Sequence, residues 1–140
     1  MIVLDSSALV KLVLEEPRSA QARKIVMEAV REGEKILIPD IALAEALNAL
    51  WKHHLIIGDL SLNQLESSAE DLLAIWRNLT VQPTVQIAKP ALKIALENRI
   101  TIYDALYLAL AKKQGSRLLT FDERLREKAE EINMPTIPQT

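Results

Sequence analysis

Two apolar stretches of the chain each carry a single acidic residue. In IALAEALNALW (41–51) only Glu45 and Asn48 are polar, and their spacing of three places them on one side of a helix. In IYDALYLALA (102–111) the only charged residue is Asp104. Burying an unpaired carboxylate costs several kcal/mol or keeps it protonated. We therefore expect both helices to direct their polar groups into a shared polar cavity.

Two further acids follow short apolar runs, Asp5 after IVL (2–4) and Asp122 two residues after RLLT (117–120). Four carboxylates in one cavity repel each other by roughly 3 kcal/mol per pair at ~5 Å and an effective dielectric constant of ~20. A hard divalent cation such as Mg²⁺, which takes oxygen ligands, removes this cost. The chain has no cysteine, and its two histidines, His53 and His54, are adjacent on a helix and make a poor metal pair.

Each acid also has a simpler interpretation when it is taken alone. Three of the acids lie at or near the starts of predicted helices, where acidic and hydroxyl side chains commonly cap the backbone. Glu45 alone could be one charge on a solvated helix face. Capping is the simpler interpretation for each single residue, whereas the combination favours a common site. The residues that fit helix caps are Asp5 and Ser6, Thr101 with Asp104, and Thr120 with Glu123.

The elements that must position these acids alternate between strands and helices. Apolar runs predict strands at 2–4, 35–38 and 117–120, with a minor strand within 80–86 and a possible edge strand at 135–138. Helical spacing fills the intervals, including a helix capped by Asp40 that ends at Gly58. We expect a three-layer α/β/α sandwich around a parallel sheet of about four to five short strands. Ligands bind such sheets at the carboxyl ends of the strands.

Length and composition limit the class of protein. A chain of 140 residues predicts one domain, 1–140. A net charge of −2 and an aromatic content of 4% disfavour a strongly basic nucleic-acid binder or a base-stacking platform. The lack of cysteine, of a signal peptide and of a long apolar run predicts a cytoplasmic protein that does not enter the membrane. The hydrophobic content of 49% suggests that some apolar surface is covered by a partner.

Three segments of the sequence resemble the PIN-domain family, most of all the VapC-type ribonuclease toxins of toxin–antitoxin pairs. They are VLDSSALVKL (3–12), ALAEALNAL (42–50) and ITIYDALYLALAKKQGSRLLTFDERL (100–125). The resemblance implies that Asp5, Glu45, Asp104 and Asp122 are catalytic and hold Mg²⁺ or Mn²⁺. It places the hydroxyls of Ser6 and Thr120 beside them, and Asn48 is the further supporting polar residue that we expect.

The resemblance also implies an activity and partners. The protein would be a metal-dependent endoribonuclease that leaves a 3′-hydroxyl and a 5′-phosphate, with RNA as substrate, a cognate antitoxin and a homodimeric assembly. Basic residues near the motifs are candidates for phosphate contacts, although ordinary surface charge is the better expectation for most of them. They are Arg99, Lys112, Lys113, Arg117 and Arg124.

Two other interpretations stay open. A catalytically weak PIN-like module could bind RNA or protein, although its acid set would then have no need to be intact. Another Mg²⁺-dependent phosphate-processing α/β protein, such as a haloacid-dehalogenase-like phosphatase or a receiver domain, would also place an aspartate after the first strand. The phosphatase requires D-x-D there and the receiver requires an early acidic pair, whereas this chain has DSS at 5–7.

Overall fold

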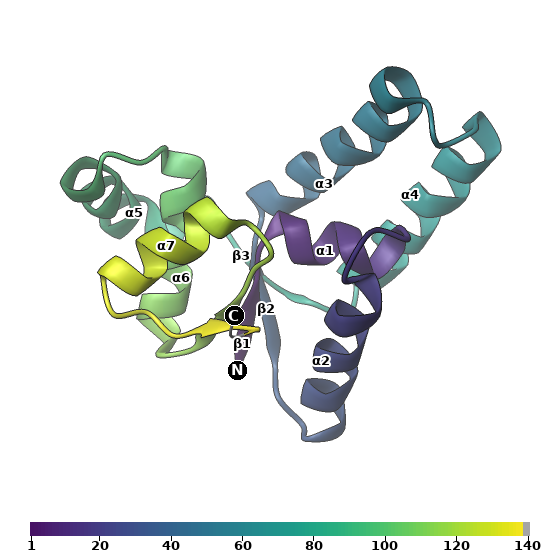
Figure 1. Cartoon of the computed structure of the whole chain (residues 1–140). Coiled ribbons are helices and arrows are strands. Elements are labelled where there is room, and N and C mark those ends of the chain that lie inside the picture. Colours follow the sequence, from purple (N-terminus) through teal and green to yellow (C-terminus); the bar gives the residue numbers. More distant parts are fainter. Residues whose placement is uncertain (139–140) are drawn as a thin grey trace.

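The centre of the protein is a parallel five-stranded sheet (Figure 1). The computed structural model describes residues 1–138. The strand order is β3-β2-β1-β4-β5, and every neighbouring pair is parallel. β1 is fully buried because it lies in the middle of the sheet, where Val3 faces Leu37 on one side and Leu118 on the other. The strands are β1 (Ile2–Leu4), β2 (Ile36–Pro39), β3 (Thr80–Gln82), β4 (Arg117–Leu119) and β5 (Thr136–Ile137).

Helices cover both faces of the sheet. The helices between β1 and β3 pack on one face, and those that follow β3 pack on the other (Figure 1). The expected three-layer α/β/α sandwich with a parallel sheet is therefore confirmed. Within residues 1–138 the helices are α1 (Ser6–Val13), α2 (Ser19–Arg31), α3 (Ile41–Lys52), the π-helix η1 (His53–Ile57), α4 (Leu62–Trp76), α5 (Thr84–Asn98), α6 (Ile102–Gln114) and α7 (Glu123–Glu131).

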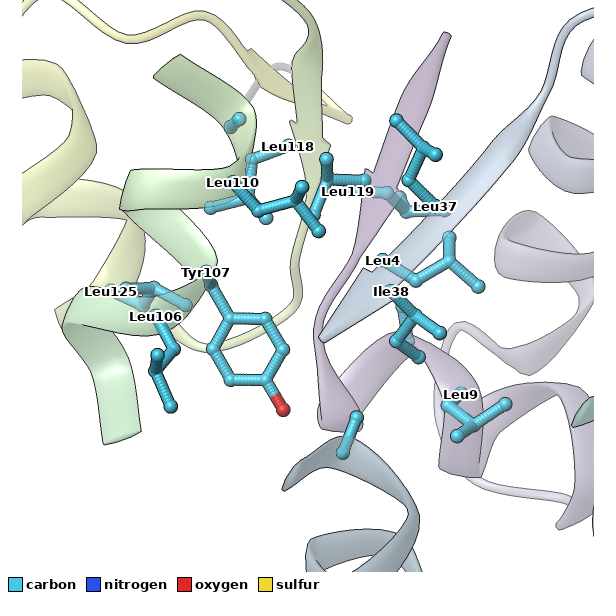
Figure 2. Close-up of a cluster of buried hydrophobic side chains, with 14 of the residues drawn as sticks. Leu4, Leu9, Leu37, Ile38, Leu106, Tyr107, Leu110, Leu118, Leu119 and Leu125 are labelled. Carbon is cyan, nitrogen blue, oxygen red and sulfur yellow. The ribbon is translucent and has the colours of Figure 1, made fainter. Parts of the chain in front are cut away.

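The apolar core is built around α6, whose residues from Ala105 to Ala111 are all buried. A helix that is apolar on every side must be covered on every side, and α6 packs against α5 as well as against β1, β2 and β4. Figure 2 shows Leu106 and Leu110 on one side of the strands and Leu9 of α1 on the other. This burial fixes the first turn of α6, which carries Asp104, at one end of the sheet.

Helices α3 and α4 form an arm that extends from the body of the protein (Figure 1). The helix expected to end at Gly58 does so, but its last turn is the π-helix η1, and Gly58 ends it with a φ of +80°. The prediction that Asp40 caps α3 is wrong. Asp40 precedes α3 without capping it, and its carboxylate instead accepts hydrogen bonds from the backbone N (3.0 Å) and the hydroxyl of Thr84 at the start of α5.

None of the helices formed by residues 1–138 combines the length and the apolar character needed to cross a membrane.

Candidate active site

The sheet changes its direction of winding between β1 and β4, and two of the predicted acids follow these two strands. β1 leads to α1 on one face, whereas β4 leads to α7 on the other. Parallel sheets bind ligands at such a switch point, beyond the carboxyl ends of the strands. The hydroxyl of Thr120 donates to Oδ2 of Asp5 and accepts from the backbone N of Asp122 at 3.0 Å. The ends of β1 and β4 are therefore joined through one side chain.

Asp5 is the most buried of the four acids, with 2% of its surface exposed. Its Oδ1 accepts from the Ser7 hydroxyl at 2.6 Å and from the backbone N of Ala8 at 2.9 Å, so it caps α1 as one interpretation predicted. Burial nevertheless raises the pKa of Asp5 to about 6. The hydrogen bonds of Ser7, Thr120 and Ala8 oppose this rise, and the nearby charge of Asp122 adds to it. Asp5 therefore caps α1, but burial makes its ionised form less favourable than that of an exposed aspartate.

Only one of the two hydrogen bonds of the predicted Thr101–Asp104 capping box is present. Its backbone N donates to the Thr101 hydroxyl at 3.3 Å, but no hydrogen bond within residues 1–138 returns from its carboxylate to the backbone N of Thr101. The side chain is half-buried, and this burial, together with the charge of Asp122, raises its pKa, while Arg124 lowers it. The carboxylate of Asp104 is therefore not used by the helix cap and faces other acids.

Glu45 reaches the same region from α3. Its Oε1 accepts a hydrogen bond from the hydroxyl of Tyr107 on α6. Burial raises the pKa of Glu45, the Tyr107 hydrogen bond lowers it, and the charge of Asp104 raises it again. In Figure 2 the ring of Tyr107 lies beside the apolar cluster and its hydroxyl points away from it. Tyr107 therefore brings a polar group from the core to the site.

The cap predicted from Thr120 and Glu123 is wrong. Asp122 is the residue that caps α7, because its Oδ1 accepts from the backbone N of Arg124 (2.9 Å) and of Leu125 (3.2 Å). The Thr120 hydroxyl is instead occupied by Asp5 and the backbone of Asp122. Thr120 is completely buried, so these two bonds satisfy a hydroxyl that would otherwise be unpaired.

Taken together, the four acids form a chain of mutually repelling neighbours. Glu45 is coupled to Asp104, Asp104 to Asp122, and Asp122 to Asp5. In the part of the chain that the structure describes, no three His, Cys, Asp or Glu side chains are close enough to hold one ion together. Carboxylates and hydroxyls are the donors that Mg²⁺ and Mn²⁺ prefer, and Mg²⁺ keeps several waters and takes one or two protein carboxylates. The residues fit a hydrated cation of this kind.

A model of the PIN domain matches residues 2–131 of the chain. A curated relative, Ribonuclease VapC3 of Pyrobaculum aerophilum, is 37% identical over 127 residues, which span 91% of this chain and 93% of the relative. The chain belongs to the PIN-domain family. The predicted resemblance, including that to VapC ribonucleases, is confirmed.

Solved structures give the same result for the fold. A crystal structure of a Pyrobaculum aerophilum protein has a TM-score of 0.67 and 28% identity, and the match covers 91% of this chain and 78% of that one. A toxin–antitoxin complex from Klebsiella pneumoniae has a TM-score of 0.62 at 17% identity, with 89% and 88% covered. At that identity the second likeness concerns the fold alone.

This PIN domain also contains site residues that sequence reasoning missed. Tyr107 and Ser7 hold Glu45 and Asp5, respectively. A signal existed for Tyr107, because it lies three residues after Asp104 and so shares its side of α6. Of the predicted supporting residues, Thr120 bonds Asp5 directly and Ser6 interacts with the Tyr107 hydroxyl. Asn48 is exposed, and within residues 1–138 no hydrogen bond links it to an acid.

The structure separates four of the five basic residues that lie near the PIN-domain motifs. Arg124 acts on Asp104 and is therefore near the acids. Arg117 starts β4, at the opposite end of the strand from Thr120, and pairs with Glu34 at 3.0 Å. The lysines of the last turn of α6, Lys112 and Lys113, lie at the end of the helix away from Asp104. Of these four, only Arg124 is placed to meet a substrate at the acids.

Proposed function

We propose that the protein is a metal-dependent endoribonuclease and the toxin of a VapBC-type toxin–antitoxin pair. The curated relatives named as VapC ribonucleases support this activity. The observation that carries the proposal is the chain of coupled acids at the switch point of the sheet. Within residues 1–138 no Lys, Arg or His forms an ion pair with any of these acids, and Arg124 offsets only part of the charge at Asp104, so the remaining repulsion is left for a bound cation to relieve.

In this proposal Asp5, Glu45, Asp104 and Asp122 would hold a hydrated Mg²⁺ or Mn²⁺, with one or two of the carboxylates as direct ligands and the others reaching it through its waters. When bound, the cation would lower the pKa of a coordinated water and offset the charge that develops on the scissile phosphate. Thr120 and Ser7 keep the Asp5 carboxylate in one orientation, and Tyr107 does the same for Glu45.

Asp104 is suited to receive the proton of the attacking water. Its carboxylate is not used by the helix cap and is half-buried beside the other acids, so it is free to accept a proton from a water in the site.

The same proposal includes two protein partners. A cognate antitoxin is supported by the Klebsiella pneumoniae neighbour, which is a toxin–antitoxin complex. A homodimer is supported by apolar side chains left exposed, among them Val85 (82%) and Leu96 (73%) on α5. The tip of the arm exposes a second group of three, Leu55, Ile56 and Ile57. We place the protein in the cytoplasm, where an RNA target and an antitoxin would both be present.

The test is a cleavage assay on RNA with Mn²⁺ or Mg²⁺ and with EDTA. Wild-type protein should cleave with metal and stop in EDTA, and Asp104→Asn should be inactive under both conditions. Asp71→Asn, which removes a carboxylate from the exposed face of α4, should cleave like wild type. Cleavage that persists in EDTA would overturn the metal mechanism. A protein that binds RNA or a partner without cleaving would instead be the catalytically weak module.

A further inference from the structure

Phe121 occupies a fixed position beside the acids without being one of them. It lies between Thr120 and Asp122, and its backbone N donates to the Ser7 hydroxyl at 2.9 Å. The same hydroxyl donates to Asp5 at 2.6 Å. The half-buried ring of Phe121 is therefore held at a fixed position relative to Asp5, the most buried acid of the site.

Two cationic side chains lie against this ring. The Lys11 Nζ is 5.4 Å from the ring centroid, and the Arg18 guanidinium carbon is 4.9 Å from it. Lys11 follows Ser7 by one helical turn and shares its side of α1. Both distances fall in the range of a cation–π interaction. The ring therefore contacts two positively charged side chains, one from α1 and one from the start of α2.

Arg18 is the less neutralised of the two cations. Its Nε donates to the neutral side chain of Gln21 at 2.8 Å, and within residues 1–138 it forms no ion pair with an acid, whereas Lys11 pairs with Glu16 at 3.3 Å. The backbone of Arg18 has a φ of 71°, a left-handed conformation that non-glycine residues rarely adopt. Such strain persists where the surrounding structure holds it, and it concentrates at binding sites.

We propose that Arg18 and Lys11, positioned by Phe121, form a phosphate-binding subsite for the RNA strand next to the scissile bond. This inference rests on the proposed ribonuclease function. The four acids repel a polyanion, so the strand needs cations on each side of them. Arg124 on α7 supplies a cation on one side. On the other side the Phe121 ring positions Lys11 of α1 and Arg18 at the start of α2. A guanidinium binds phosphate bidentately, and an ammonium adds a point charge.

The test measures binding of a short, mixed-sequence single-stranded RNA by fluorescence anisotropy, with all variants made in the Asp104→Asn protein so that the RNA stays intact. Arg18→Gln and Lys11→Gln should each weaken binding roughly tenfold. Each should also reduce the slope of log K against log salt concentration by about 0.7, the value for one phosphate contact to a single strand. The matched control, Lys112→Gln at the far end of α6, should change neither quantity.

Phe121 has its own pair of variants. Phe121→Leu removes the aromatic ring and should weaken binding in the same direction as the loss of a cation, whereas Phe121→Tyr keeps the ring and should bind like the parent. Thermal melting of every variant shows whether it is folded. If Arg18→Gln and Lys11→Gln bind like the Lys112→Gln control, the subsite is refuted.

A cleavage assay in the wild-type background separates this inference from the function on which it rests. If wild-type protein cleaves, Arg18→Gln should raise KM about tenfold and leave kcat nearly unchanged, because the contact is made equally before and during the reaction. Cleavage with unaltered KM and unaltered binding refutes the subsite alone. Loss of binding in the variants of a protein that never cleaves supports the subsite and refutes the nuclease.

Discussion

Replacing Asp5 with asparagine should remove the loss of stability that the metal-free protein shows as the pH rises toward neutral. Burial raises the pKa of Asp5 from 3.8 to about 6. The folded state therefore binds this proton more tightly than the unfolded chain does. The stability that protonated Asp5 contributes is complete below pH 4 or so and is lost as the pH rises through about 6. The shift corresponds to about 3 kcal/mol. Asparagine has no charge to bury and keeps the cap of α1, but its amide NH₂ cannot accept from the Thr120 hydroxyl, a pH-independent loss of about 1–3 kcal/mol.

The measurement is urea unfolding in EDTA at several pH values from about 4 to about 7.5. Between these limits the unfolding free energy of wild type should fall relative to that of Asp5→Asn by up to about 3 kcal/mol. Groups that do not interact with Asp5 titrate alike in both proteins and cancel in this difference. Asp71→Asn, on the exposed face of α4, should keep the wild-type pH dependence. Equal pH dependence in wild type and Asp5→Asn would refute the claim that Asp5 is held ionised at a cost.

Three more outcomes follow from the site and the core. At a Mg²⁺ concentration 100 times the dissociation constant, wild type should gain about 2.7 kcal/mol of stability, and Asp104→Asn should gain clearly less; thermal melts with and without metal decide this. Tyr107→Phe should lose about 0.5–1.5 kcal/mol in urea unfolding together with most of its RNA cleavage, because Glu45 loses its donor; wild-type cleavage in this variant would contradict that role. Leu72→Ala should cost about 2–5 kcal/mol in urea because Leu72 is buried where α4 meets the core, and a smaller loss would mean that the arm unfolds separately.

Most of the fold could be predicted because its determinants are local. Apolar runs marked the strands β1, β2 and β4, and the capping box of Ser61 and Gln64 at the start of α4 likewise depends on neighbours in the sequence alone. The caps that failed depend on distant partners. Asp40 bonds Thr84, 44 residues away, and the Thr120 hydroxyl bonds Asp5 instead of its own helix. No short-range rule weighs a local cap against a partner that only the folded sheet brings near.

The site was predictable where a charge stood out from an apolar background. Glu45 and Asp104 were conspicuous for that reason, and in the structure the charge of Asp104 raises the pKa of Glu45. Tyr107 and Phe121 did not stand out, because an aromatic residue in an apolar segment has the pattern of ordinary core, and only the spacing from Asp104 pointed to Tyr107. Their roles depend on what lies across from them: Glu45 on another helix for Tyr107, and two cations for Phe121.

The bond between Thr120 and Asp5 has a consequence for the time at which the protein becomes active. The two residues are separated by 115 positions in the chain. At a synthesis rate of 5–20 residues per second, roughly 6 to 23 s pass between their translation. During that interval the nascent chain holds Asp5 without its partner strand and lacks Asp122 altogether. A ribosome that makes this protein therefore carries an incomplete site until the segment from Thr120 to Asp122 has been translated.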